Sequence, residues 1–237
     1  MTRFLLLPGG GGAAYVWHHV VDALTARGHL AVAVDLPAED PAAGLEEYAD
    51  VAAAAARAAA PDEADAPWTV VGLSLGAFTA PLLAARLEVA ELVLINPMVP
   101  TPGESASAWW AATGQSEAMA AAARAGGYPS DFDLEGTFLH DVDPGERVVL
   151  AEHEREELGA AFEDPWPLRS WPDVPVRVVA SASDRLFPAD FVARVARARL
   201  DVATTVVPGG HLSPLSRPAE MTAALLGDGV PAAGAGA

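Results

Sequence analysis

The stretch that decides the fold reads VVGLSLGAF, at residues 70–78. Its centre, Ser74, lies in a Gly-x-Ser-x-Gly pattern that follows an apolar, β-like run and precedes a helical one. A sharp strand-to-helix turn needs small residues two positions before and after the serine, and Gly72 and Gly76 supply them. Such a turn presents the hydroxyl at a helix N-terminus, whose dipole favours negative charge. The alternative is a serine that only caps the helix, but the strand and helix on either side favour a nucleophile.

Six β-like runs occur along the chain, and helix-length segments separate the earlier ones. The runs are Arg3–Leu7, Leu30–Val34, Thr69–Gly72, Leu92–Ile95, Val176–Ala180 and Ala203–Val207. The helical segments are Ala13–Arg27, Leu45–Ala60 and Leu75–Leu87. Strands that alternate with helices predict parallel strands, and nearly continuous apolar runs predict a sheet covered on both faces. We therefore predict an α/β protein with a mostly parallel sheet of about six strands, flanked by helices.

The spacing of the strands breaks after Ile95, because no comparable run follows until Val176. A loop that long without structure is rare in a compact domain. The interval contains an alanine-rich stretch at Ala118–Ala125 and a charged helical pattern at Val148–Leu158. We therefore expect an α/β core formed by 1–96 and 168–226, a helical cap at 97–167, and a flexible tail at 227–237.

Composition argues against several classes of protein. The 237 residues carry a formal charge of −18, and all 14 basic residues are arginine. So acidic a chain repels phosphate backbones and anionic lipids, and we expect no nucleic-acid and no membrane partner. The absence of cysteine excludes disulfides and thiolate ligands. No stretch fits a signal peptide or a membrane span, so we expect a cytoplasmic protein; no pattern specifies its oligomeric state.

A serine hydroxyl needs a base to remove its proton, and the position of His211 favours it for that role. His211 follows the last β-like run, in a loop at the carboxyl edge of the sheet, which also carries Ser74. The alternative is a loop histidine that caps the helix beginning near Ser213. Other histidines lie in helical or turn contexts that favour packing or exposure: His18, His19, His29 and His153.

The base in turn needs a carboxylate, and Asp184 follows the fifth run at the same edge. The position after the fourth run holds Asn96, which carries no charge, and Asp35 suits a turn. An ordinary ion pair between Asp184 and Arg185 is the alternative. The chain order of serine, aspartate and histidine matches that of Gly-x-Ser-x-Gly hydrolases, so we predict a triad of Ser74, Asp184 and His211.

An oxyanion hole built from two backbone N–H groups should accompany this serine, and Leu75 offers the first. The loop after the first run, PGGGG at residues 8–12, can offer the second, because glycines let the backbone approach a substrate closely. This loop lacks the lysine ending of a phosphate loop, and a dinucleotide fingerprint has no clear acidic partner beyond Asp35. We therefore expect no cofactor and no metal.

Together these motifs resemble the α/β-hydrolase superfamily, over nearly the whole chain to about Leu226. The chain is similar in particular to the small, cofactor-free branch of plant methyl esterases, hydroxynitrile lyases and bacterial esterase-like proteins. The markers are the glycine loop with AYVW at 14–17, the turn at Ser74, NPMVP at 96–100, GES at 103–105, DR at 184–185 with Pro188, and GHLSPLSRPAE at 210–220. The resemblance implies an α/β-hydrolase fold and, by matching positions, assigns the second oxyanion N–H to Gly10.

The chain departs from this branch at several positions. Pro8 stands where the family usually has a histidine before the glycine of the oxyanion loop. Leu212 stands beside His211 where the lyases have a lysine, which argues against the lyase reaction. Ser74 excludes the acidic nucleophile of dehalogenases and epoxide hydrolases, and Leu75 stands where perhydrolase-like members tend to have methionine.

These features predict a serine hydrolase that cleaves a small carboxylic ester through an acyl-enzyme intermediate. Activity should fall on acidification, since His211 must be neutral to act. The alternatives are a lactone, thioester or amide hydrolase with the same triad, or a non-catalytic ligand-binding member of the fold. Candidate substrate contacts, each with core packing as its alternative, are Met98, Trp109, Trp110, Phe138 and Phe187. His140 is a polar candidate, whose alternative role with Asp141 is to hold the cap.

Overall fold

A computed structural model describes residues 1–61, 66–153 and 155–228 of the chain. In this part of the chain, six strands form one parallel sheet in the order β2-β1-β3-β4-β5-β6. The strands are β1 Arg3–Leu7, β2 Leu30–Ala33, β3 Trp68–Leu73, β4 Val89–Ile95, β5 Val176–Ser181 and β6 Thr204–Val207. The predicted parallel sheet of six strands is therefore confirmed.

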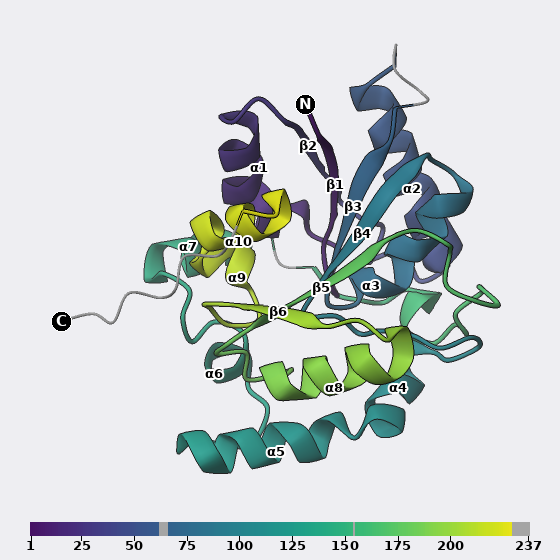
Figure 1. Ribbon diagram of the computed structural model, residues 1–237. Helices are drawn as coiled ribbons and strands as arrows, with labels where there is room; N and C mark the ends of the chain where they lie inside the picture. The colour runs from purple at the N-terminus through teal and green to yellow at the C-terminus, as the bar shows by residue number, and fades with distance from the viewer. Residues whose placement is uncertain (62–65, 154, 229–237) are drawn as a thin grey trace.

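Helices cover both faces of the sheet (Figure 1). One face carries α2 Leu45–Ala59, α3 Gly76–Thr79, α4 Ala106–Thr113 and α8 Ala189–Leu200. The other carries α1 His18–Thr25, α9 Ser213–Ser216 and α10 Pro218–Leu226. Successive side chains of a strand point to opposite faces, so Leu5 joins one hydrophobic core and Leu6 the other. Two buried faces explain why the strands have nearly continuous apolar sequences.

Two of the predicted helices are divided in the structure. The segment at Ala13–Arg27 forms a 3-10 turn, η1 Ala14–Trp17, before α1 begins. The segment at Leu75–Leu87 forms the short helix α3 and then the 3-10 helix η2 Ala80–Ala85. Pro81 explains the second division, because proline has no N–H to continue the α-helical pattern from α3.

Helices also fill the interval between β4 and β5. After α4 come α5 Gln115–Gly126, α6 Leu134–Thr137, α7 Pro144–Glu152 and the 3-10 turn η3 Ala160–Phe162. The charged pattern predicted at Val148–Leu158 is helical only as far as Glu152, and α7 begins earlier, where the carboxylate of Asp143 accepts from the Gly145 N–H. That residues 97–167 act as a cap, with those boundaries, stays a prediction.

The topology of the sheet places a crevice beside Ser74. The strand order reverses at β1, because β2 and β3 pair with its two opposite edges. The chain leaves the carboxyl end of β1 toward α1 and the carboxyl end of β3 toward α3, on opposite faces of the sheet. Diverging connections of this kind open a ligand-binding crevice at the strand ends. The loops that begin at Pro8 and Ser74 border it.

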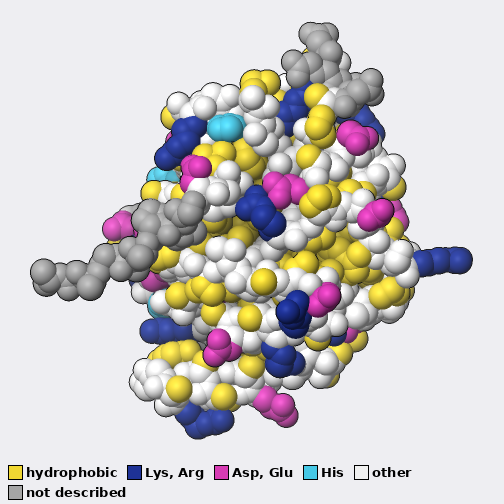
Figure 2. Space-filling view, viewed as in Figure 1, with side chains coloured by type: hydrophobic (Ala, Val, Ile, Leu, Met, Phe, Trp, Pro, Cys, Tyr) yellow, Lys and Arg dark blue, Asp and Glu magenta, His cyan; other side chains and the backbone are white. Residues whose placement is uncertain are grey.

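On the face shown in Figure 2, acidic and arginine side chains lie interspersed.

Near the C-terminus, α10 ends at Leu226, and Gly227, which follows it, has a left-handed φ of 74°. Residues 229–237 of the predicted tail lie outside the described residues.

Within the described ranges, no helix combines the length and the apolar character needed to cross a bilayer.

Candidate active site

Ser74 lies in a strained turn at the end of β3. Its φ is 53°, in the left-handed region that side chains with a Cβ rarely adopt. A Cβ on Gly72 would lie 2.7 Å from the Gly76 carbonyl oxygen, and one on Gly76 would lie 2.5 Å from that of Pro8. Both glycines are therefore required by close backbone approach. The N–H of Ser74 donates to the Ile95 carbonyl at 2.9 Å, which holds the turn against β4.

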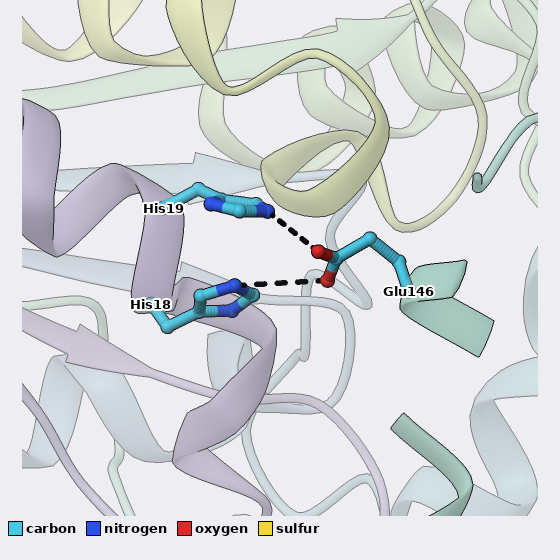
Figure 3. A group of neighbouring side chains, drawn as sticks. All are labelled: His18, His19 and Glu146. Atoms are coloured by element: carbon cyan, nitrogen blue, oxygen red, sulfur yellow. Dashed lines mark hydrogen bonds and ion pairs between the residues drawn. The ribbon is translucent and has the colours of Figure 1, made fainter. Parts of the chain in front are cut away.

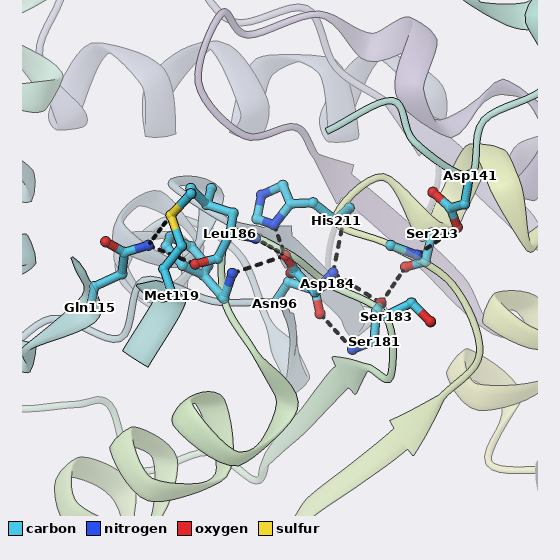
Figure 4. Close-up of polar contacts among 12 residues, drawn as sticks. Asn96, Gln115, Met119, Asp141, Ser181, Ser183, Asp184, Leu186, His211 and Ser213 are labelled. Atoms are coloured by element: carbon cyan, nitrogen blue, oxygen red, sulfur yellow. Dashed lines mark hydrogen bonds and ion pairs between the residues drawn. The ribbon is translucent and has the colours of Figure 1, made fainter. Parts of the chain in front are cut away.

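His211 and Asp184 form a buried pair at the same edge of the sheet (Figure 4). Nδ1 of His211 lies 2.8 Å from Oδ2 of Asp184. The other carboxylate oxygen, Oδ1, accepts from the N–H groups of Leu186 and Phe187 at 2.8 and 2.9 Å. A carboxylate only accepts, so Nδ1 carries the proton and the lone pair of the neutral ring is at Nε2.

Nε2 of His211 is buried and has no hydrogen-bond partner among the described residues, the Ser74 hydroxyl included. Phe138 and Phe187 contact the ring edge-on, with centroid distances of 4.9 and 5.1 Å, and fix its plane. His211 and Ser74 line the same cavity. A neutral Nε2 can accept a proton from a nearby hydroxyl, and hydrogen bonds of this kind commonly tighten only when a substrate binds.

Asn96 holds the loop of His211 in place, a role not predicted from the sequence. Its side chain is fully buried and its φ is 42°. Nδ2 donates to the His211 carbonyl and to the Ser181 hydroxyl, both at 3.0 Å, and Oδ1 accepts from the Ser181 N–H at 2.7 Å. The Ser181 hydroxyl in turn donates to that of Ser213 at 2.8 Å (Figure 4). The signal in the sequence that could have revealed this role was an amide side chain directly after a buried strand, at the edge of the sheet that carries Ser74.

The backbone N–H groups of Gly10 and Leu75 lie where an oxyanion hole was predicted. Both residues line the cavity with Ser74. Neither N–H donates a hydrogen bond to any of the described residues. Gly10 is also unobstructed, with nothing within 4 Å of where a Cβ would stand. Two unengaged N–H groups beside a serine are suited to binding the oxygen of a substrate carbonyl.

Glu157 anchors the glycine loop, and sequence reasoning missed it. Its Oε2 accepts from the Gly11 N–H at 2.9 Å, and its Oε1 accepts from the Tyr48 hydroxyl at 2.5 Å. Burial raises the pKa of the Glu157 carboxyl above its usual range, and the two hydrogen bonds oppose this only in part. Burial, followed by the bond to Glu157, also raises the pKa of Tyr48. Glu157, which lies between β4 and β5 in the sequence, thus holds the loop that begins with Pro8.

The cavity lined by Ser74 and His211 has a volume of about 640 Å³. Of the six candidate substrate contacts, three line it: Met98, Trp110 and Phe138. Polar residues that were not predicted also line it: Glu135, Arg147, His153, Arg155 and Glu157. A smaller hollow of about 330 Å³ lies at the opposite, amino-terminal end of the strands, beside Phe4 and Arg177.

The other three candidates, Trp109, Phe187 and His140, are not among the residues that line this cavity. Trp109 is fully buried, and its indole N–H donates to the Val99 carbonyl at 3.0 Å. Phe187 is fully buried between Trp109 and the His211 ring, with centroid distances of 5.2 and 5.1 Å. Both aromatic residues are therefore packed in the core, which was the stated alternative to substrate contact.

His140 and Asp141 contact the loops that carry the buried pair. Nε2 of His140 lies 3.0 Å from the Ser183 carbonyl, and Asp141 accepts from the Gly210 N–H at 2.6 Å. Burial lowers the pKa of His140, which favours its neutral form. Arg185, the alternative partner of Asp184, donates instead to the Gly136 carbonyl at 2.9 Å.

Comparison with known proteins places the chain in a family. Residues 4–225 match the model of the alpha/beta hydrolase family. A rice protein (Oryza sativa subsp. indica) named probable esterase PIR7A is 36% identical over 111 residues, which are 43% of this chain and 41% of the rice protein. The chain thus matches less than half the length of that curated relative.

Solved structures with similar folds extend over almost all of the chain. Polyneuridine aldehyde esterase has a TM-score of 0.73 at 18% identity, over 96% of this chain and 98% of its own. A pyrethroid hydrolase from Sphingobium faniae JZ-2 has a TM-score of 0.72 at 23% identity, over 95% and 96%. Identities this low show a shared fold. The resemblance inferred from the motifs is confirmed, and the family match runs from the second residue of β1 through β6 and includes the turn at Ser74: the chain belongs to the α/β-hydrolase family.

Proposed function

We propose that this chain is a serine esterase that hydrolyses small carboxylic esters. One observation carries the proposal. Asp184 engages Nδ1 of His211, while Nε2 has no hydrogen-bond partner in the described part of the chain, and His211 lines the same cavity as Ser74. Oγ of Ser74 attacks the carbonyl carbon of the ester as Nε2 of His211 takes the hydroxyl proton. The carboxylate of Asp184 stabilises the resulting imidazolium and keeps its ring oriented.

The N–H groups of Gly10 and Leu75 bind the oxyanion of the tetrahedral intermediate. Removal of one such donor typically raises a barrier by about 2.7–4 kcal/mol, so both should contribute measurably. Collapse of the intermediate breaks the bond to the alcohol oxygen, and the alcohol leaves with the proton held by His211. Water then attacks the acyl group on Ser74, with His211 again taking a proton. The bond between Oγ and the acyl carbon breaks, His211 returns the proton to Oγ, and the carboxylic acid is released.

The cavity supports a small apolar ester as substrate. Its volume of about 640 Å³ falls within the roughly 300–1,000 Å³ typical of small-molecule sites. Met98, Trp110 and Phe138 provide apolar wall beside Ser74. The names of the rice relative and of polyneuridine aldehyde esterase also favour esters. Lactones, thioesters and amides are open to the same attack, so hydrolysis rates across these acyl classes separate the alternatives.

Hydrolysis of p-nitrophenyl acetate and butyrate at about pH 8, where histidine is largely neutral, tests the proposal. The wild type should hydrolyse both esters, and Ser74→Ala should lose at least a thousandfold in kcat. Ser116→Ala, on α5 and outside the cavity wall, is the matched control and should retain full activity. A serine-reactive fluorophosphonate should label the wild type and the control but not Ser74→Ala. Turnover by Ser74→Ala equal to that of the wild type would refute the assignment of Ser74 as the nucleophile. A folded wild type that is not labelled, and that retains a ligand without turnover, would favour a binding protein.

A further inference from the structure

A second group of chemically active side chains lies outside the cavity wall. His18 and His19 at the start of α1 and Glu146 in α7 point toward one another (Figure 3). Nε2 of His19 lies 3.1 Å from Oε1 of Glu146, and Nε2 of His18 lies 3.6 Å from Oε2. One ligand atom from each of the three residues lies within 4.8 Å of the other two. All three side chains are partly exposed, so an ion can reach them from solvent.

The hydrogen bonding of His18 directs a lone pair at Glu146. Nδ1 of His18 lies 2.8 Å from the carbonyl oxygen of Tyr15. A carbonyl only accepts, so Nδ1 carries a proton, and Nε2 of the neutral ring has none. Nε2 of His18 therefore faces a carboxylate oxygen of Glu146 at 3.6 Å, and a cation between the two atoms would be bound by both. Metal-binding histidines are arranged in this way, with the far ring nitrogen donating to a carbonyl group.

Tyr15 also orients the carboxylate. Its hydroxyl donates to Oε2 of Glu146 at 3.1 Å. Its ring stacks on that of His18, with a centroid distance of 4.3 Å, and on that of His153 at the same distance. Both the imidazole and the carboxylate are therefore held in position before an ion binds, which lowers the entropy lost on binding.

We propose that His18, His19 and Glu146 form a zinc site. Two ligand atoms at about 2.0–2.1 Å from a tetrahedral zinc ion are about 3.3 Å apart. The separations of 3.1 and 3.6 Å, which end at the two different oxygens of Glu146, lie on either side of that value, and one ligand atom from each residue lies within 4.8 Å of the others. Two imidazoles and one carboxylate are a ligand set that zinc uses, with the fourth position open to water. The formal charge of −18 also raises the local concentration of cations.

The sequence alone does not reveal this site. Neighbouring side chains on an α-helix do not usually face each other. His18 and His19 lie at the junction of the 3-10 turn η1 with α1, and their ring centroids are only 3.8 Å apart. Glu146 is 127 residues away from His19. The ion would link α1 to α7, several of whose residues line the cavity. The zinc site does not depend on the esterase proposal.

Calorimetric titration of zinc chloride into the untagged, metal-free chain at about pH 7.5 tests the proposal, because zinc binds the deprotonated forms of its ligands and its affinity falls in acid. The wild type should bind one zinc ion per chain. His19→Gln and Glu146→Gln should each weaken binding at least tenfold, as removal even of outer-shell partners typically does. His29→Gln, which changes a histidine elsewhere on the surface, is the matched control and should bind like the wild type.

Thermal unfolding provides a second measurement. Zinc should raise the Tm of the wild type and of His29→Gln, and should leave the Tm of His19→Gln and Glu146→Gln unchanged. Circular dichroism establishes that each variant is folded. Wild-type protein without binding heat and without a shift in Tm at about 100 μM zinc would overturn the proposal. Undiminished binding by both His19→Gln and Glu146→Gln would overturn it as well.

Discussion

Replacement of Asn96 by alanine should lower the free energy of unfolding by about 5 kcal/mol. The change removes three buried hydrogen bonds, of 2.7, 3.0 and 3.0 Å, and takes the partner from two buried groups, the Ser181 N–H and the His211 carbonyl. Each buried polar group left without a partner costs about 1–3 kcal/mol. The φ of 42° at Asn96 adds about 1 kcal/mol, because alanine tolerates the left-handed region less well than asparagine.

Urea unfolding measures this loss, and the wild-type midpoint should fall by about 2 M in Asn96→Ala. Ser213→Ala is a matched control at the far end of the same network, where only the bond to the Ser181 hydroxyl is lost. Its cost should be about 1 kcal/mol, since the Ser181 hydroxyl keeps its bond to Asn96. A loss in Asn96→Ala no larger than that in Ser213→Ala would refute the argument that this amide holds the loop of His211.

Three further changes probe other contacts of the molecule. Asp184→Asn should stay folded, because an amide oxygen can still accept from the Leu186 and Phe187 N–H groups. It should lower kcat for p-nitrophenyl esters about 10⁴-fold by favouring the wrong tautomer of His211, and a loss below tenfold would contradict the proposed role of Asp184. Glu157→Gln should alter the pH dependence of stability. Burial raises the folded-state pKa of Glu157 above that of the unfolded chain, so the contribution of this group is full below the unfolded pKa and is lost as pH rises through the folded one. The urea midpoint of Glu157→Gln should therefore rise relative to that of the wild type as pH increases above the usual glutamate pKa, and a constant difference would count against a buried, titrating carboxyl. Glu104→Ala should cost about 2–4 kcal/mol, because it leaves the guanidinium of Arg199, whose side chain is only 13% exposed, without its carboxylate. Arg197→Ala, from an exposed pair, is the control at under about 1 kcal/mol, and similar losses in the two variants would show that burial does not matter here.

The strands could be predicted closely because burial on both faces produces a local signal. β1 begins and ends where its apolar run does, at Arg3 and Leu7, and the other five strands lie within three residues of their predicted bounds. The helices were less predictable. The segment after Ser74 has helical composition, but Pro81 removes an N–H and the helix changes type there. Helical composition does not show where the helix changes type, whereas the backbone hydrogen bond that Pro81 cannot donate does.

In the candidate site, too, the residues with a local sequence signal could be predicted, and those that depend on contacts between distant segments could not. Ser74, Asp184 and His211 could be assigned to one edge because parallel strands share their carboxyl ends. Glu157 could not be assigned, because its bond to Gly11 joins residues 146 positions apart. The aromatic candidates show the limit clearly. Trp109 and Trp110 are neighbours on α4, yet the first is fully buried and the second lines the cavity. An apolar pattern cannot separate the two, since both environments are apolar.

The left-handed backbone at Ser74 has a consequence for directed evolution. A glycine at this position would relieve about 1–2 kcal/mol of backbone strain. The greater conformational freedom of glycine in the unfolded chain would offset only about 0.4–1 kcal/mol of this stabilisation. Selection for heat resistance alone should therefore favour glycine here, and with it the loss of the hydroxyl on which the proposed reaction depends. Thermostability campaigns on this chain need a simultaneous screen for turnover, because a stabilising glycine at position 74 would lack the hydroxyl of the proposed nucleophile.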